Sequence, residues 1–199
     1  LICNVGDVCL SRRGADGRHH VLPLHADISV RARSLGFDYL TPILWLKIAN
    51  ANFESGDAGG GFLGKPYEPG GIVKNDLEYI LMLRKPGAYR SPTMAQRESS
   101  RLTKAEQATW FQPIWTGIQG AAPTKEHPAP FPEEIAYRLI RMFSFTEDIV
   151  LDPFGGSGTT SVAAWRANRH SIYNDVEVSY RNHAEQRLKQ EQRQQRWQW

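Results

Sequence analysis

A glycine-rich stretch, Asp-Pro-Phe-Gly-Gly-Ser-Gly-Thr-Thr, occupies residues 152–160 and constrains the fold more than any other feature. It follows a short apolar run at residues 149–151 and precedes a helix-like run at residues 161–167. Glycine lacks a Cβ atom, so the backbone can turn sharply and approach a ligand closely. A strand, a tight turn and a helix in this order predict an α/β fold with an adenosine-type ligand at the carboxyl end of a parallel strand.

A second acidic residue strengthens this interpretation. Asp175 ends the next predicted strand, residues 172–175, and Asp152 ends the first one. In nucleotide-binding sheets an acidic residue at this position can accept hydrogen bonds from ribose hydroxyls. An ordinary strand-to-helix turn, with Asp175 as a helix cap, remains the alternative on these features alone. The glycines are not followed by the Lys-Ser/Thr pair that a phosphate-binding loop requires.

The remaining chain alternates predicted strands and helices around one irregular region. Strands are predicted at residues 1–10 (with a break at Gly6-Asp7), 41–48, 77–84, 149–151 and 172–175. Helices are predicted at residues 23–36, 132–143, 161–167 and 178–195. Residues 50–71 are glycine-rich and read as a loop, and residues 85–124 read as an inserted recognition region or flexible lobe. The 199 residues are enough for one full domain with a small inserted lobe.

Composition excludes several classes of function. The longest apolar runs are far too short to span a bilayer, so we expect no membrane association. Cys3 and Cys9 are the only cysteines, which make neither a disulfide framework nor a metal cluster and fit a reducing cytoplasm. The histidines His19, His20 and His25 lack cysteine or acidic partners at metal-binding spacing, so we expect no metal.

Basic residues gather in two parts of the chain. The first cluster is Arg84, Lys85, Arg90, Arg97, Arg101 and Lys104, against the single acid Glu98. The second is Arg181, Arg187, Lys189, Arg193 and Arg196, against Glu185 and Glu191. Such clusters can bind phosphates. For the C-terminal cluster, a solvated helix surface is the better interpretation.

The motifs together resemble the β-group of amino-methylating DNA methyltransferases, which use S-adenosylmethionine. DPFGGSGTT resembles that family's cofactor loop, and HPAPFPEEIAYRLI, from His127, resembles the segment before it. SIYNDVEVSYRNHAEQRL resembles the ribose-binding strand and its helix. Three further strands of that family resemble segments of this chain: residues 1–10 (LICNVGDVCL), 42–47 (PILWLK) and 78–85 (EYILMLRK). The likeness covers nearly the whole chain and implies a Rossmann-like methyltransferase fold in circularly permuted order.

The resemblance implies roles for particular residues and regions. The cofactor-binding residues would be His127, Pro128, Ala129, Phe131, Asp152, Pro153, Phe154, Gly155, Gly156, Ser157, Gly158, Thr159 and Thr160, with Asp175 at the ribose. The DNA-binding residues would be Arg84, Arg90, Arg97, Arg101, Trp45 and Lys47. Residues 1–84 would form the sheet half that follows the catalytic loop, 85–124 a target-recognition insertion, and 125–199 the cofactor-binding half.

The sequence departs from the family at two places. Val178-Ser179-Tyr180 stands where the family has Pro-Glu-Tyr, so only the tyrosine matches. More seriously, the family's catalytic loop contains a Pro-Pro pair, and this chain has none. That loop orients the acceptor amine and stacks on the flipped base. It would lie upstream of Leu1, so we expect a chain incomplete at its N-terminus, with no catalytic residue of its own and negligible activity by itself.

The function implied is methyl transfer from S-adenosylmethionine to an exocyclic amine in a specific double-stranded DNA sequence. We favour N4 of cytosine over N6 of adenine, because the strand end at residues 4–7 resembles members that act on cytosine. A non-catalytic cofactor- or DNA-binding module is the alternative, and RNA or protein methylation a weaker third. Cytosine C5 methylation is discounted, because neither cysteine follows a proline. The resemblance also admits a homodimer, a cognate restriction endonuclease and a cytoplasmic location in a bacterium, archaeon or phage.

Overall fold

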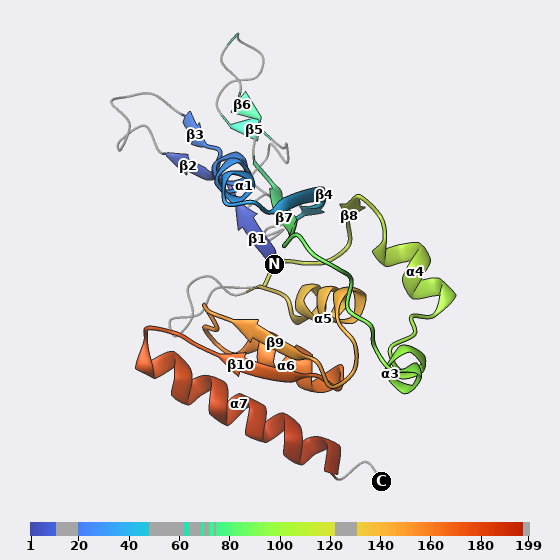
Figure 1. Cartoon of the computed structure of the whole chain (residues 1–199). Helices are drawn as coiled ribbons and strands as arrows, with labels where there is room; N and C mark the ends of the chain where they lie inside the picture. Colours follow the sequence, from blue (N-terminus) through green and yellow to red (C-terminus); the bar gives the residue numbers. More distant parts are fainter. Residues whose placement is uncertain are drawn as a thin grey trace. The chain divides into compact units, whose positions relative to one another are not determined.

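The computed structural model describes residues 1–10, 20–47, 62–63, 69, 72–73, 75–121 and 131–196 (Figure 1). Contacts within the chain separate two compact units. Unit 1 consists of Leu1–Tyr89 and Gln112–Gln119, and unit 2 of Arg90–Phe111 and Gly120–Trp199. The segment 85–124 therefore contributes to both units and forms no unit of its own.

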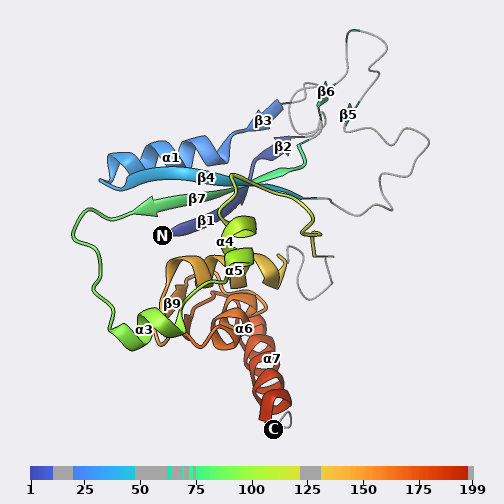
Figure 2. The same cartoon turned by 90° about the vertical axis from the view of Figure 1, so that its right-hand side faces the viewer.

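Unit 1 is built on a four-stranded sheet in the order β1-β7-β4-β8. Its strands are β1 (Ile2–Gly6), β4 (Asp38–Leu46), β7 (Leu77–Arg84) and β8 (Ile114–Trp115). Strand β7 is antiparallel to both neighbours, whereas β8 is parallel to β4. Helix α1 (Leu24–Ser34) lies along one face of this sheet (Figure 2). Two short antiparallel pairs complete the unit: β2 (Val8–Leu10) with β3 (His20–Leu22), and β5 (Phe62–Leu63) with β6 (Ile72–Val73).

The core of unit 1 lies on both faces of β7. Ile80 and Leu81, which point to opposite faces, have no exposed surface, as the apolar composition of this strand predicts. Trp45 is also fully buried, and its indole N–H donates to the carbonyl of Ile118 at 3.0 Å. The predicted helix at residues 23–36 ends earlier than expected: α1 stops at Ser34, and Leu35 is 78% exposed.

Unit 2 contains a two-stranded parallel sheet of β9 (Ile149–Asp152) and β10 (His170–Tyr173). Its helices are α3 (Met94–Ser99), α4 (Lys104–Trp110), α5 (Glu133–Phe143), α6 (Thr159–Arg166) and α7 (Val178–Arg196). Small residues of α6, Ala163 and Ala164, pack against Ala136 and Ile140 of α5 and form the centre of the core. Val150 of β9 packs on this cluster. Alanines on α6 thus let α5, α6 and the sheet approach closely.

Helices α3 and α4 correct the expectation of an irregular lobe at residues 85–124. Each helix begins with a capping box, in which the side chains of the N-cap residue and of the third helical residue bind each other's backbone amides. Thr93 pairs in this way with Gln96, and Thr103 with Glu106. The many polar residues in this segment therefore begin two helices instead of a disordered loop.

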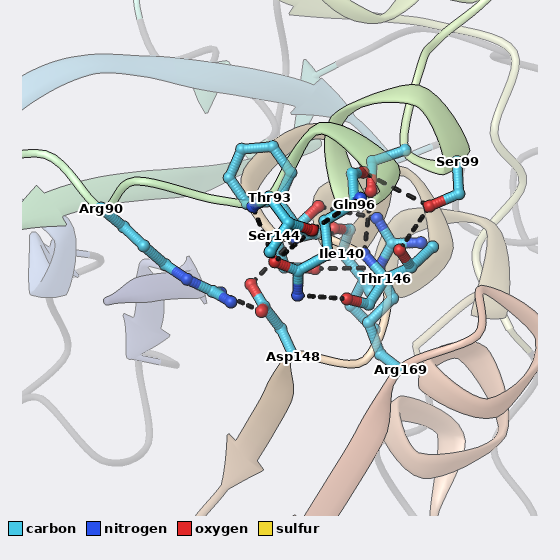
Figure 3. A network of polar contacts seen from close by, with 11 residues as sticks. Arg90, Thr93, Gln96, Ser99, Ile140, Ser144, Thr146, Asp148 and Arg169 are labelled. Atoms are coloured by element: carbon cyan, nitrogen blue, oxygen red, sulfur yellow. Dashed lines mark hydrogen bonds and ion pairs between the residues drawn. The ribbon is translucent and has the colours of Figure 1, made fainter.

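A polar network docks α3 onto the loop before β9 (Figure 3). The Gln96 amide donates to the carbonyl of Thr146 at 3.2 Å, and the hydroxyls of Ser99 and Thr146 lie 2.6 Å apart. The Thr146 amide donates to the Ser100 hydroxyl at 2.8 Å, and Arg90 pairs with Asp148. Thr146 is only 8% exposed, so these partners satisfy polar groups that water cannot reach.

Arg169 joins the ends of two helices in the same region (Figure 3). Its guanidinium donates to the carbonyls of Ser144, at 2.7 Å, and Ala167, the C-caps of α5 and α6. A cation at helix C-termini interacts favourably with the helix dipoles. Burial of the side chain, with Arg141 nearby, lowers the Arg169 pKa.

Candidate cofactor site

The glycine-rich loop joins β9 to α6 and is held by hydrogen bonds from the segment after β10. The Gly155 amide donates to the carbonyl of Asn174, and the Gly156 amide to Asp175 Oδ2, both at 2.8 Å. The Tyr173 hydroxyl donates to the carbonyl of Gly156 at 2.8 Å. Residues 173–175 therefore fix the loop through three successive contacts.

Two of the glycines are required by close contacts. A Cβ atom on Gly155 would lie 2.2 Å from two ring carbons of Tyr173, a distance that no side chain can occupy. A Cβ atom on Gly158 would lie 2.7 Å from the Cβ of Ala184, and Gly158 has a φ of +78°, which only glycine adopts easily. Gly156, with a φ of +48°, also lies in the left-handed region.

The two predicted acidic residues lie at neighbouring strand ends. Asp152 is paired with Tyr173 in the parallel register, and its Oδ1 accepts from the Phe154 amide at 3.0 Å. Asp175 accepts from the Glu177 amide at 2.9 Å as well as from the glycine loop. Burial and the two nearby carboxylates raise the pKa of Tyr173, in that order of importance. This pair of negative charges suits a ligand that carries positive charge and hydroxyl groups.

Exposed apolar side chains lie beside these carboxylates in the sequence. Phe154 is 88% exposed and Val176 is 99% exposed. Carboxylates with adjacent apolar surface match a ligand that combines a cationic part with an aromatic base. The residues thus fit S-adenosylmethionine, which has an ammonium, a sulfonium and an adenine ring. Val176 was not among the predicted cofactor residues, although it directly follows Asp175.

The structure describes only some of the other predicted cofactor residues. His127, Pro128 and Ala129 lie outside the described residues. Phe131 is half-buried and packs on the core cluster of α5 and α6, and Pro132 is the N-cap of α5 instead of its first helical residue. In the loop itself, the carbonyl of Pro153 accepts from the Asn174 side chain at 3.3 Å. At the start of α6, Thr159 is only 5% exposed and Thr160 is half-buried, and the Ser157 and Thr159 hydroxyls lie 3.3 Å apart.

Three of the four arginines predicted to bind DNA have carboxylate partners: Arg84, Arg90 and Arg101. Arg84 pairs with Asp38 at 3.0 Å and donates to the Tyr89 hydroxyl at 2.7 Å, and the hydrogen bond to Asp38 is the main reason why the Arg84 pKa is raised. Arg90 pairs with Asp148, as the docking network requires. Either of these last two arginines would have to exchange its carboxylate partner to bind a DNA phosphate.

The tryptophan and lysine predicted to bind DNA serve the sheet of unit 1 in this structure. Lys47 pairs with Glu78 at 2.7 Å and lies over the Trp45 ring, 5.7 Å from its centre. Trp45 itself has no exposed surface. Its predicted role at a DNA surface therefore conflicts with its position in the core, where the carbonyl of Ile118 accepts its only indole proton. The pattern of β4 alone did not reveal the residues that cover it.

Three exposed basic residues of the first cluster lie on α3, on α4 and in the link between these helices: Arg97, Lys104 and Arg101. Arg101 pairs with Glu98 at 3.0 Å, but both side chains are exposed, at 75% and 68%. Arg97 and Lys104 are exposed, and no described carboxylate pairs with either. An exposed ion pair contributes little stability, so Arg101 can readily change partner.

Within the described part of the chain, no helix is long and apolar enough to cross a membrane. The same residues contain no group of three or more histidine, cysteine or acidic side chains that could hold a metal ion. Cys3 and Cys9 are both free, and burial raises the pKa of the Cys3 thiol.

Comparison with known proteins identifies relatives over most of the chain. The sequence model of a family described as DNA methylase matches residues 18–186. The type II methyltransferase M.MjaI of Methanocaldococcus jannaschii is 38% identical over 190 residues, which cover 93% of this chain and 59% of that protein. M.MthZI of Methanothermobacter thermautotrophicus is 32% identical over 197 residues, covering 94% and 53%. The chain thus spans little more than half the length of these relatives.

Solved structures agree with this result. TTHA0409 of Thermus thermophilus, a proposed DNA modification methylase in complex with S-adenosyl-L-methionine, has a TM-score of 0.81 and 48% identity, covering 96% of this chain and 69% of that one. The PvuII cytosine-N4-specific DNA methyltransferase has a TM-score of 0.61 at 16% identity, covering 96% and 67%. The second likeness concerns the fold alone, which is that of Rossmann-like methyltransferases.

Proposed function

The chain belongs to the N4-cytosine/N6-adenine family of DNA methyltransferases, and we propose that it binds S-adenosylmethionine and contacts DNA in a site-specific methyltransferase. The observation that carries the proposal is the glycine loop between Asp152 and Asp175, held in place by residues 173–175. A cofactor-bound structure of a relative with 48% identity supports the same ligand.

When bound, S-adenosylmethionine supplies an electrophilic methyl group on its sulfonium. The chain's own residues bind and orient the methyl donor. Asp175, which accepts hydrogen bonds from the amides of Gly156 and Glu177, would also accept hydrogen bonds from the ribose hydroxyls. Asp152 would attract the cationic part of the ligand, and Phe154 and Val176 would cover the adenine ring. Since hydrogen bonds within the protein hold the loop in place, binding requires little reorganisation.

The acceptor that we favour is N4 of cytosine, with N6 of adenine as the alternative. The preference rests on the strand end at residues 4–7, which resembles members of the family that act on cytosine. Digestion of DNA methylated by the complete protein, followed by mass spectrometry of the nucleosides, distinguishes the two. N4-methylcytosine is the expected product, and N6-methyladenine would contradict the preference.

For DNA contact we favour Arg97, Arg101 and Lys104 over the paired residues Arg84, Arg90 and Lys47. The first three are exposed on α3, on α4 and in the link between them; no described carboxylate pairs with Arg97 or Lys104, and the pair of Arg101 with Glu98 is largely exposed. Substitution of the three by glutamine in the complete protein should weaken DNA binding. It should also reduce the slope of log K against log salt by about 0.9 for each phosphate interaction that is removed. An unchanged slope would contradict this assignment.

The test of the proposed function is a calorimetric titration of the complete protein with S-adenosylmethionine, with and without duplex DNA, combined with a methylation assay. Cofactor binding with methylation supports the enzyme. DNA binding without cofactor binding would instead indicate a non-catalytic module derived from a methyltransferase. A cognate restriction endonuclease, a homodimer and a cytoplasmic location stay predictions.

A further inference from the structure

A side chain of the last helix reaches the cofactor loop. Arg187 of α7 donates through Nη1 to the Thr159 hydroxyl at 2.9 Å and to the carbonyl of Ser157 at 3.4 Å. Its other terminal nitrogen, Nη2, lies 3.4 Å from a carboxylate oxygen of Glu133. Ser157 and Thr159 close the glycine loop, whereas Glu133 begins α5. One guanidinium therefore joins two segments that lie far apart in the sequence.

These two segments are the ones that the sequence connects with the methyl donor. Glu133 directly follows the stretch that ends at Pro132, and Ser157 and Thr159 belong to the glycine loop. The turn of α7 that carries Arg187 also packs on the loop. Ala184 lies three residues earlier on the same helix face, is 6% exposed and leaves no space for a Cβ atom on Gly158. The expectation that the C-terminal basic cluster is solvated surface is therefore wrong for Arg187, whose side chain is 31% exposed.

A second arginine keeps Glu133 in place. Arg166 of α6 pairs with Glu133 at 2.7 Å and with Glu191 of α7 at 2.7 Å. The hydrogen bond to Glu191 is the main reason why the Arg166 pKa is raised; burial opposes it, and the charges of Glu133 and Glu191 add to it. Two arginines and two glutamates thus form a charge-balanced network over α5, α6 and α7. Partly exposed ion pairs of this kind contribute little to stability, so their main effect is on how α5, α6 and α7 are placed relative to one another.

We propose that Arg187 is a positioning residue for the methyl donor: it fixes the Ser157–Thr159 turn relative to the start of α5. The proposal rests on the proposed function, because it assigns that turn to the cofactor site. A guanidinium is suited to this task, since its planar group of donors binds two directions at once. A lysine at the same position would present a single charge and could serve only one of the two segments well.

The experiment compares R187Q and R187K with the matched control R181Q in the complete protein. Arg181 lies on the same helix and pairs with Glu185, but both side chains are largely exposed, at 68% and 50%. The probe is S-adenosylhomocysteine, and its Kd is measured by calorimetry alongside the thermal unfolding midpoint. R187Q should raise the Kd about tenfold, as expected for the loss of charged hydrogen bonds, with little change in the midpoint. R187K should recover part of the affinity, and R181Q should bind as the wild type does.

Two results would overturn the proposal. The first is a wild-type Kd in R187Q, which would make the network a purely structural contact. The second is equal weakening in R187Q and R181Q, which would indicate a general effect of charge on α7. If R187Q does not fold, R187K decides the question, since a wild-type Kd in R187K contradicts the need for a bridging guanidinium. Failure of the wild-type protein to bind the probe would instead remove the proposed function, and this inference with it.

Discussion

The glycine loop at residues 152–160 and the helices α3 and α4 both belong to unit 2, but different contacts hold them. Close contacts at Gly155 and Gly158 fix the loop, together with hydrogen bonds between the loop backbone and residues 173–175. Side chains fix the helix pair, through two capping boxes and the contacts with Thr146. The loop geometry follows from residue types at fixed places, whereas the helix pair depends on partners about 50 residues away.

The difference has a consequence for function. A loop held at its glycines and backbone atoms keeps its geometry when its own exposed side chains change, which in the proposed function suits the binding of one invariant cofactor. Helices fixed by a few side chains can change their exposed residues while the docking contacts stay. In the proposed function, this suits a surface that contacts different DNA sequences.

Gly155→Ala should cause the largest loss of stability and of cofactor affinity, and it should affect the glycine loop but not α3 and α4. The new Cβ atom would lie 2.2 Å from the Tyr173 ring, so either the loop or the ring must move. Overpacking of this kind costs about 1–3 kcal/mol of unfolding free energy. Displacement of the loop should also weaken S-adenosylhomocysteine binding, because the site would no longer be held in its binding geometry. Denaturant unfolding and calorimetry measure the two quantities.

Gly36→Ala is the matched control for this change. Gly36 has a φ of +85° but nothing within 4 Å of its Cβ position, so the change introduces strain without a clash. It should cost about 1 kcal/mol of stability and leave cofactor affinity unchanged. Wild-type affinity in Gly155→Ala would show that the loop does not need its observed geometry.

A smaller effect, confined to the helix pair, is expected from Thr146→Val. The change removes the hydroxyl that lies 2.6 Å from Ser99 and keeps the volume of a buried side chain. It should lower the free energy of unfolding by about 1 kcal/mol and speed the hydrogen exchange of backbone amides in α3, with no effect on cofactor affinity. Thr109→Val is the control, since that hydroxyl binds within its own exposed helix. Loss of cofactor affinity in Thr146→Val would show that the two regions are coupled.

The smallest effect is expected from Tyr173→Phe, which removes the hydrogen bond to the Gly156 carbonyl. Because Tyr173 is half-exposed, the loss of stability should be about 0.5 kcal/mol, at the lower end for a hydrogen bond.

The pKa of Tyr173 is raised in the folded protein, so the neutral phenol is favoured there. Stability should therefore be unaffected below the ordinary tyrosine pKa of about 10 and fall as pH rises through the higher folded value. This alkaline loss should be weaker in Tyr173→Phe, and an identical pH profile would contradict the assignment.

Local patterns in the sequence predicted most of the regular structure. The apolar run at residues 77–84 coincides with β7, and the predicted helix at residues 132–143 differs from α5 by one residue. The glycine loop was found because its residue types are required at each position. Its contact with Asp175 was also within reach, since the carboxyl ends of adjacent parallel strands lie together.

Prediction from the sequence failed where the role of a side chain depends on residues that are distant along the chain. Trp45 lies near the end of a strand with alternating character, and only the segment around Ile118, 73 positions away, shows that its indole is buried. Arg187 looked like one cation among several on a polar helix, and its contact with Thr159 spans 28 positions. The capping boxes of α3 and α4 were visible signals that the high content of glycine, proline and serine nearby obscured.

Hydrogen–deuterium exchange of the complete protein, with and without saturating S-adenosylhomocysteine, tests most directly whether the glycine loop is the cofactor site. Slower exchange is expected at residues 153–159 and 174–177, because the ligand would cover the loop and the segment that fixes it. Exchange in α3 and α4, residues 94–110, should stay unchanged. Binding that slows exchange only outside the loop, or leaves residues 153–159 unaffected, would contradict the account.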